Sequence, residues 1–151
     1  MASESGNIKE SVQLPSMNIE LDTQGIVYVT YVEGSIIDIE EKKEERETIL
    51  KLTKGVKHPV LFSFENMVTI TRAAKEYSVT SEAEDSFLAV ALMAESFAHV
   101  IASNFYIKFY NPKIASKVFR NDIKAVEWLL EVKNTREEKK SDSSKSTFSS
   151  L

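Results

Sequence analysis

The sequence contains no cysteine, only two histidines and only four glycines among its 151 residues. The absence of cysteine excludes disulfides, thiolate zinc sites and thiol nucleophiles, and it is typical of proteins in the reducing cytoplasm, where we expect this one. Glycine stands only at positions 6, 25, 34 and 55, so neither a Walker loop nor a GxGxxG turn is present. We therefore expect no cofactor. We also expect no metal site, because His58 and His99 are not a pair at i,i+4.

Positive charge and long apolar runs are also scarce. The net charge is −4, and this mildly acidic balance argues against nucleic-acid binding, which needs clustered Lys and Arg. The most apolar stretch, residues 87–110, is interrupted by polar side chains such as Glu95, His99 and Lys108. We therefore expect no stable insertion into a membrane. The N-terminus also lacks the basic-then-apolar pattern of a signal peptide.

No side-chain arrangement typical of an enzyme stands out, so we expect a non-enzymatic protein without catalytic residues. No serine stands in a nucleophile-elbow turn. His99 lies in an otherwise apolar segment, which is typical of a packed histidine. It would suggest a general base only if it were exposed in a cleft beside a carboxylate. The carboxylates of Glu40, Glu41, Glu44 and Glu45 indicate a solvated helix face with i,i+4 ion pairs.

The length predicts one domain, over residues 16–133. Residues 1–15 are small and polar and predict a flexible N-terminal arm. Residues 134–151 are rich in lysine and serine and have almost no apolar side chains. Such a segment cannot bury enough surface to offset the entropy of ordering, so we predict a disordered tail.

Within the domain, the apolar pattern predicts alternating strands and helices. Residues 17–22 and 26–32 predict an antiparallel hairpin, and residues 58–64 predict a strand buried on both faces. A helix capped by Ser35 is predicted to run to about Thr53 and to stop at Gly55. Two helices are predicted to follow, one from Thr71 and a short one opened by a capping box of Ser81 with Glu84. The remaining predicted elements are a strand from about Leu88 to Met93, a helix over 96–110, a strand over 115–119, and a helix over 122–132 capped by Asn121. The order ββαβαβαβα predicts an α/β fold with a mixed sheet of about five strands and packed helices.

Six short segments carry a family resemblance: 25–28 (GIVY), 31–34 (YVEG), 49–53 (ILKLT), 59–61 (PVL), 70–77 (ITRAAKEY) and 89–92 (AVAL). Their ordered series resembles the small bacterial SpoIIAA-like or STAS-like domains of uncharacterised function, which are also grouped with SEC14-type folds. The resemblance covers residues 22–130 and implies the same fold. It also implies a protein-interaction or regulatory module. The analogy with SEC14-type folds implies an alternative, the binding of a small apolar or lipid-like ligand.

The resemblance also locates the position of a known switch. Anti-sigma antagonists of the STAS class carry a phosphorylatable serine in an Asp-Ser-Ser-Gly turn after a buried strand. The matching turn here is 71–74, and the phosphoacceptor position falls on Arg72 or Ala73, so the switch is lost. Thr71 offers a hydroxyl one position away, and its place before a helix favours a helix cap over a phosphosite.

Basic side chains at two places are candidate binding residues. Arg72 and Lys75 follow Thr71 at a helix N-terminus, where free N–H groups favour an anion or carboxylate; the alternative is surface charge paired with nearby glutamates. Lys42 and Arg46 belong to a helix stripe expected to face the sheet, together with Ile36, Ile39, Ile49 and Leu50. Either these two side chains extend to solvent, or the helix leaves a cleft for a ligand or partner.

An aromatic helix supplies the last candidates, because Phe97, Ile101, Phe105 and Phe109 form one stripe with Tyr106 and Tyr110 beside it. The stripe mainly predicts packing in the core. The alternative is a homodimer interface or a groove for an apolar ligand.

Two outcomes would separate these alternatives. A cavity lined by Val90, Leu92, Ile101 and Phe105 would favour a small apolar ligand. A packed core with an exposed aromatic patch would favour a protein partner or a homodimer.

Overall fold

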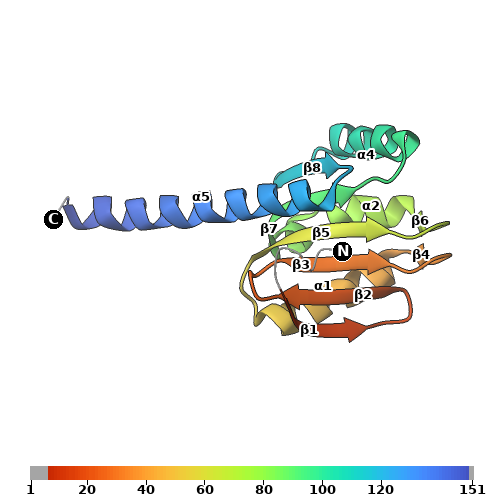
Figure 1. The fold of residues 1–151 in the computed structure, drawn as a ribbon, viewed down its shortest axis with the longest axis horizontal. Helices are drawn as coiled ribbons and strands as arrows, with labels where there is room; N and C mark the ends of the chain where they lie inside the picture. Colours follow the sequence, from red (N-terminus) through yellow and green to blue (C-terminus); the bar gives the residue numbers. More distant parts are fainter. Residues whose placement is uncertain (1–6, 150–151) are drawn as a thin grey trace.

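Six strands form one mixed sheet in the computed structural model, which describes residues 7–149 and the side-chain surroundings of residues 7–137 (Figure 1). The sheet order is β1-β2-β3-β5-β7-β8. The pairs β1/β2 and β2/β3 are antiparallel and the other neighbours are parallel. The strands are β1 (Ile8–Gln13), β2 (Met17–Asp22), β3 (Val27–Tyr31), β5 (His58–Phe64), β7 (Phe87–Met93) and β8 (Ala115–Phe119), and a second small sheet pairs β4 (Ile36–Ile37) with β6 (Thr69–Ile70). The predicted α/β fold with a mixed sheet is confirmed.

Helices cover both faces of this sheet. They are α1 (Ile39–Thr53), α2 (Arg72–Ser78), α3 (Ser81–Glu84), α4 (Phe97–Tyr110) and α5 (Asp122–Ser149). On one face, α5 packs on β5, β7 and β8 through Ala125, Val126 and Leu129. On the other face, α1 contacts β2 and α4 contacts β8. Successive side chains of β5 point to opposite faces of the sheet and so belong to two different cores. Leu61 faces α5, whereas Val60 and Phe62 face α1.

Part of the segment predicted to be a flexible arm forms a strand, since residues 8–13 make up β1; residues 1–6 lie outside the part of the chain that the structure describes. β1 is an edge strand with mostly exposed side chains, and Val12 alone is half-buried. Hydrogen bonding to β2, and not burial, therefore orders β1. A strand ordered in this way has little apolar pattern in its sequence.

Helix α1 begins three residues later than predicted. Ile36 and Ile37 pair with β6, so Ser35 does not cap the helix. Asp38 does, in a capping box with Glu41. The helix ends as predicted, with Lys54 and Gly55 at positive φ.

The buried stripe of α1 also differs from the prediction. Its buried residues are Lys42, Glu45, Ile49, Leu52 and Thr53, whereas Ile36 lies before the helix and is exposed. Arg46 and Leu50 are half-buried. The later start changes which side chains face the sheet and turns the Glu45 carboxylate inward.

Helix α3 is capped by Thr80 rather than by Ser81. Glu84 therefore does not complete a capping box with Ser81. Its buried carboxylate instead accepts the backbone N–H of Lys113, at 3.0 Å to Oε2. This bond ties the segment after α4 to α3.

Helix α5 is much longer than predicted. Asn121 caps it as expected, but it continues beyond the core to Ser149, through most of the segment predicted to be disordered (Figure 1). Residues 135–140 include several strong helix formers, Arg, Glu and Lys, whose intrinsic propensity favours a helical backbone. Among the described residues, no helix is both long enough and apolar enough to cross a membrane.

Candidate functional site

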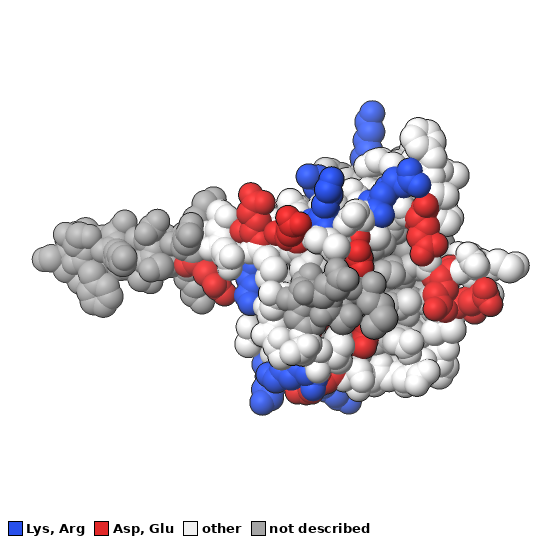
Figure 2. All heavy atoms as spheres, in the orientation of Figure 1, with Lys and Arg blue, Asp and Glu red and all other residues white. Residues whose placement is uncertain are grey.

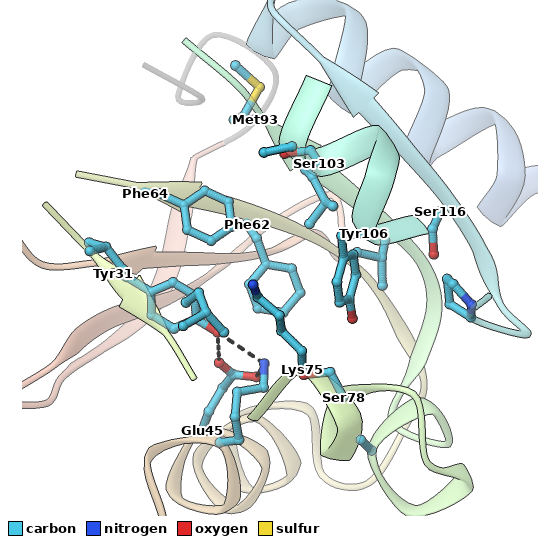
Figure 3. A pocket seen from close by; sticks show the side chains of 18 of the residues that line it. Tyr31, Glu45, Phe62, Phe64, Lys75, Ser78, Met93, Ser103, Tyr106 and Ser116 are labelled. Atoms are coloured by element: carbon cyan, nitrogen blue, oxygen red, sulfur yellow. Dashed lines mark hydrogen bonds and ion pairs between the residues drawn. The ribbon is translucent and has the colours of Figure 1, made fainter. Parts of the chain in front are cut away.

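A cavity of about 660 Å³ lies on the sheet face that carries α1, α2 and α4 (Figure 3). Its position follows from the way the helices are spaced. Because α1 packs over β2 and α4 over β8, the central strands β5 and β7 lie between two separated helices. The elements that follow β6, α2 and α3, have only seven and four residues and leave this gap partly open.

The wall of the cavity is mainly aromatic and aliphatic. Phe62 and Phe64 project from β5, Val90 and Leu92 from β7, and Tyr106 from α4. These strand residues point to this face because side chains two positions apart share a face of the sheet. Part of the wall is aromatic packing, with the Tyr31 and Phe62 ring centroids 6.0 Å apart. The wall suits an apolar molecule of modest size.

A buried cluster of three polar side chains forms one end of the cavity. The Lys42 ammonium lies 2.8 Å from Glu45 Oε2 and 3.0 Å from the Tyr31 hydroxyl, and the Tyr31 hydroxyl donates to Glu45 Oε1. Lys42 also lies 4.8 Å from the centroid of the Phe62 ring, a cation–π contact. The side chains of Lys42 and Glu45 are only 9% and 3% exposed. These contacts pair each buried charge, as burial requires.

Burial raises the pKa of Tyr31 well above its ordinary value, and the charge of Glu45 raises it further. The Tyr31 hydroxyl therefore keeps its proton at neutral pH and remains a donor to Glu45. Burial also raises the pKa of Tyr106, another tyrosine of the wall, to about 12, so its hydroxyl stays neutral as well.

The other charged side chains around the cavity differ in how they are paired. Arg46 donates to the backbone carbonyl of Glu82 at 3.1 Å, and Glu65 accepts the backbone N–H of Glu33 at 2.9 Å. Lys75 reaches from α2 into the cavity (Figure 3), and its ammonium makes no hydrogen bond or ion pair with any described residue. Lys75 is therefore a cation available to a ligand.

His99 lies at the rim of the cavity. It is exposed and lines the cavity, as Glu95 does, but its ring has no hydrogen bond or ion pair with a carboxylate there. Within the described part of the chain, no group of three or more His, Asp or Glu side chains is placed to hold a metal ion.

The candidates at the start of α2 separate in the structure. Thr71 is the helix cap, accepting from Ala74 N at 3.1 Å, as predicted. Its hydroxyl also donates to Asp38 Oδ1 at 2.8 Å, which joins the caps of α1 and α2 and lowers the pKa of Asp38. Arg72 points to solvent and pairs loosely with Glu76, at 3.6 Å. Neither Thr71 nor Arg72 lines the cavity, whereas Lys75 does.

Replacing Thr71 with Ala should lower the free energy of unfolding by roughly 0.5–2 kcal/mol, because the cap is lost. The pKa of Asp38 should rise in the same variant, since the hydrogen bond from Thr71 is the main cause of its lowering. Chemical denaturation and NMR titration measure the two effects. The Thr71→Ser variant keeps a hydroxyl and should retain most of both, whereas equal behaviour of the Ala variant and the native protein would exclude the cap.

The aromatic stripe of α4 faces solvent, so the prediction that it lies mainly in the core is wrong. Phe97, Ile101, Phe105 and Phe109 are 70%, 58%, 63% and 65% exposed. The opposite side of the helix packs inward and contributes Tyr106 to the cavity. Tyr110 is half-buried and lies against Tyr106, with ring centroids 5.1 Å apart.

The cavity therefore contains four of the predicted site residues: Lys42, Arg46, Lys75 and Tyr106. It also contains groups that the sequence analysis did not identify, chiefly Tyr31, Glu45, Phe62 and Phe64. A lysine and a glutamate at i,i+3 on one helix stripe were the available signal for the buried pair, but the same spacing is common on solvated helices.

Comparison with known proteins agrees with the fold. An uncharacterised protein of the DUF3478 family from Shewanella loihica, described as having a SpoIIAA-like fold, is similar in structure with a TM-score of 0.53. It is 16% identical in sequence, and the match covers 80% of this chain and 99% of that one. No curated protein matches the chain. The resemblance to SpoIIAA-like domains is thus confirmed at the level of fold. Residues 19–133 match the model of DUF7793, a domain of unknown function, and the chain belongs to this family.

Proposed function

We propose that the protein binds a small amphipathic molecule, with an apolar body and an anionic group, in the cavity beneath α4. The observation that carries this proposal is a cavity of about 660 Å³ with a mainly apolar wall and one unpaired cation. Ligand pockets typically enclose about 300–1,000 Å³ and combine an apolar lining with a few polar groups.

The apolar body is assigned to the part of the cavity formed by β5, β7 and α4. Phe62, Phe64, Val90 and Leu92 line it, with Tyr106 opposite. Left exposed to water, this surface would cost free energy in proportion to its area, and an apolar ligand would cover it. Of the four residues whose place in a cavity wall would favour an apolar ligand, Val90 and Leu92 line this cavity, whereas Ile101 and Phe105 are exposed and do not.

Lys75 is the side chain that we expect to bind the anionic group of the ligand. Among the cations of the wall, Lys42 is paired with Glu45 and Arg46 with a backbone carbonyl, which leaves Lys75 free to bind a carboxylate or phosphate. Glu95, a lining carboxylate whose side chain has no partner among the described residues, is exposed and therefore well hydrated. A charge-assisted hydrogen bond to Lys75 would orient the ligand.

The test is a fluorescence titration of the full chain with cis-parinaric acid, a fluorescent fatty acid. We expect saturable binding, and we expect Lys75→Met to weaken it roughly tenfold or more because a charged hydrogen bond is lost. Lys51→Met, which removes an exposed lysine on α1, is the matched control and should bind like the native protein. The methyl ester of the probe should be insensitive to both changes. Absence of saturable binding would contradict the proposal.

A protein-interaction role is the second candidate, favoured by the exposed aromatic side of α4. The absence of serine at the phosphoacceptor position argues against control by phosphorylation there. A regulatory role and a cytoplasmic location remain predictions from the sequence.

A further inference from the structure

The outer side of α4 is an unusually apolar surface for an exposed helix. Phe97, Ile101, Phe105 and Phe109 follow one another at intervals of four residues and are all more than half exposed. The Phe105 and Phe109 rings stack on each other, with centroids 5.6 Å apart, and Phe109 also meets the Tyr110 ring of the same helix edge to face, at 5.1 Å. Four large apolar side chains in one row form a patch, and exposed patches of this kind mark binding surfaces.

The charge of this region is opposite to that of the whole molecule. Residues 96–121, which comprise α4, β8 and their flanks, contain Lys108, Lys113, Lys117 and Arg120 and no acidic residue. The segment thus carries +4 in a chain of −4, and the remainder carries −8. Figure 2 shows basic side chains at the upper edge of the molecule, where α4 and β8 lie in Figure 1. An anionic surface would attract this edge and repel the rest, which fixes the orientation of approach.

We propose that the outer side of α4 docks on an anionic lipid surface, with its phenyl rings in the interfacial layer and Lys108 and Lys113 near the head groups. A helix with large apolar side chains on its exposed side and lysines close by has properties that interfacial binding requires. Lys108 is exposed on α4 itself, and Lys113, also exposed, stands three residues after the end of the helix.

A second copy of the chain suits this surface less well. In a two-fold interface a surface meets its own copy, so Lys108 would face another helix without acidic residues. The basic side chains of the two copies would then repel each other, and residues 96–121 contain no acidic side chain to offset this repulsion. The proposal goes beyond ligand binding and rests on different residues, since the four apolar side chains do not line the cavity.

The test is co-sedimentation of the full chain with vesicles of phosphatidylcholine and phosphatidylglycerol, and with vesicles of phosphatidylcholine alone. We expect binding to the mixed vesicles that is weaker without the anionic lipid. Each phenyl ring should contribute at least tenfold to the partition coefficient, so Phe105→Ser/Phe109→Ser should weaken binding at least a hundredfold. Lys108→Gln should weaken it about fivefold, on the mixed vesicles only.

Val56→Ser is the matched control, because Val56 is an exposed apolar residue outside α4, and it should bind like the native protein. Circular dichroism should show unchanged folding in all variants, since the replaced side chains are exposed. The proposal is overturned if the native protein stays in the supernatant, or if the double variant sediments like the native protein. A native dimer that the double variant converts to a monomer, without vesicle binding, would assign the surface to a second copy instead. Because vesicle binding is measured without added ligand, its failure leaves the parinaric acid result unaffected.

Discussion

Replacing Lys42 with Met is expected to lower the free energy of unfolding by roughly 3–5 kcal/mol, the largest stability effect that we expect from a single change outside the apolar core. The reason is the buried partner that remains. Glu45 is 2% exposed and would keep one hydrogen bond, from Tyr31, but would lose the ammonium 2.8 Å away. An unpaired carboxylate at this depth costs more than the pair itself contributes. Urea denaturation followed by circular dichroism measures the change.

The exposed pair Arg72–Glu76 is the matched control for this prediction. It also joins a basic and an acidic residue on one helix, but its side chains are 82% and 58% exposed. Arg72→Met should therefore leave the stability almost unchanged, because water screens surface ion pairs. A loss of less than about 1 kcal/mol in Lys42→Met, the range of a surface pair, would contradict the buried cluster.

Removing the whole cluster should be much less damaging than breaking it. The triple variant Tyr31→Phe/Lys42→Met/Glu45→Leu leaves none of the three polar groups of the cluster, and we expect it to recover most of the stability lost in Lys42→Met. Such recovery would mean that the cluster is not needed for stability. Its place on the wall of the cavity would then point to a role in ligand binding.

Replacing Ser103 with Trp is expected to weaken the binding of cis-parinaric acid at least tenfold, equivalent to about 1.4 kcal/mol. Ser103 lies on the inner side of α4 and points into the cavity (Figure 3). An indole at this position would occupy space that the proposed ligand needs. The same fluorescence titration measures the loss.

Asn104→Trp is the matched control, since it adds the same indole one position along α4, on the exposed side and outside the cavity. It should leave the affinity for the probe unchanged. If both variants lost affinity equally, the probe would be bound elsewhere or the helix would be disturbed. If neither lost affinity, the cavity would not be the binding site.

The sequence predicted the strands that have a clear apolar pattern. The strands β2, β5 and β8 lie where this pattern placed them: β2 has buried residues, β5 is buried on both faces, and β8 turns half-buried side chains inward. The sequence analysis missed the edge strand β1 and the extension of α5 because neither has a periodic apolar pattern. Hydrogen bonding to β2 determines β1, and helix propensity determines the extension of α5.

The site was harder to predict, because its properties depend on which side of a helix faces the sheet. Lys42 was identified as an unusual charge on an inward stripe, but Glu45 was assigned to a solvated face. For α4, the aromatic row was expected to pack inward, whereas Tyr106 does so and Phe105 does not. Periodicity shows which residues share a side of a helix. Because α4 has apolar side chains on more than one side, the pattern does not show which side faces the sheet.

Native mass spectrometry of the full chain, purified from its own cells without denaturation, tests the claim of ligand binding most directly. We expect the native protein to carry one additional small mass per chain that is lost on denaturation, and we expect Ser103→Trp to lack it. The account would be contradicted if both proteins showed the bare mass of the chain, and if the native protein still did so after addition of excess oleate.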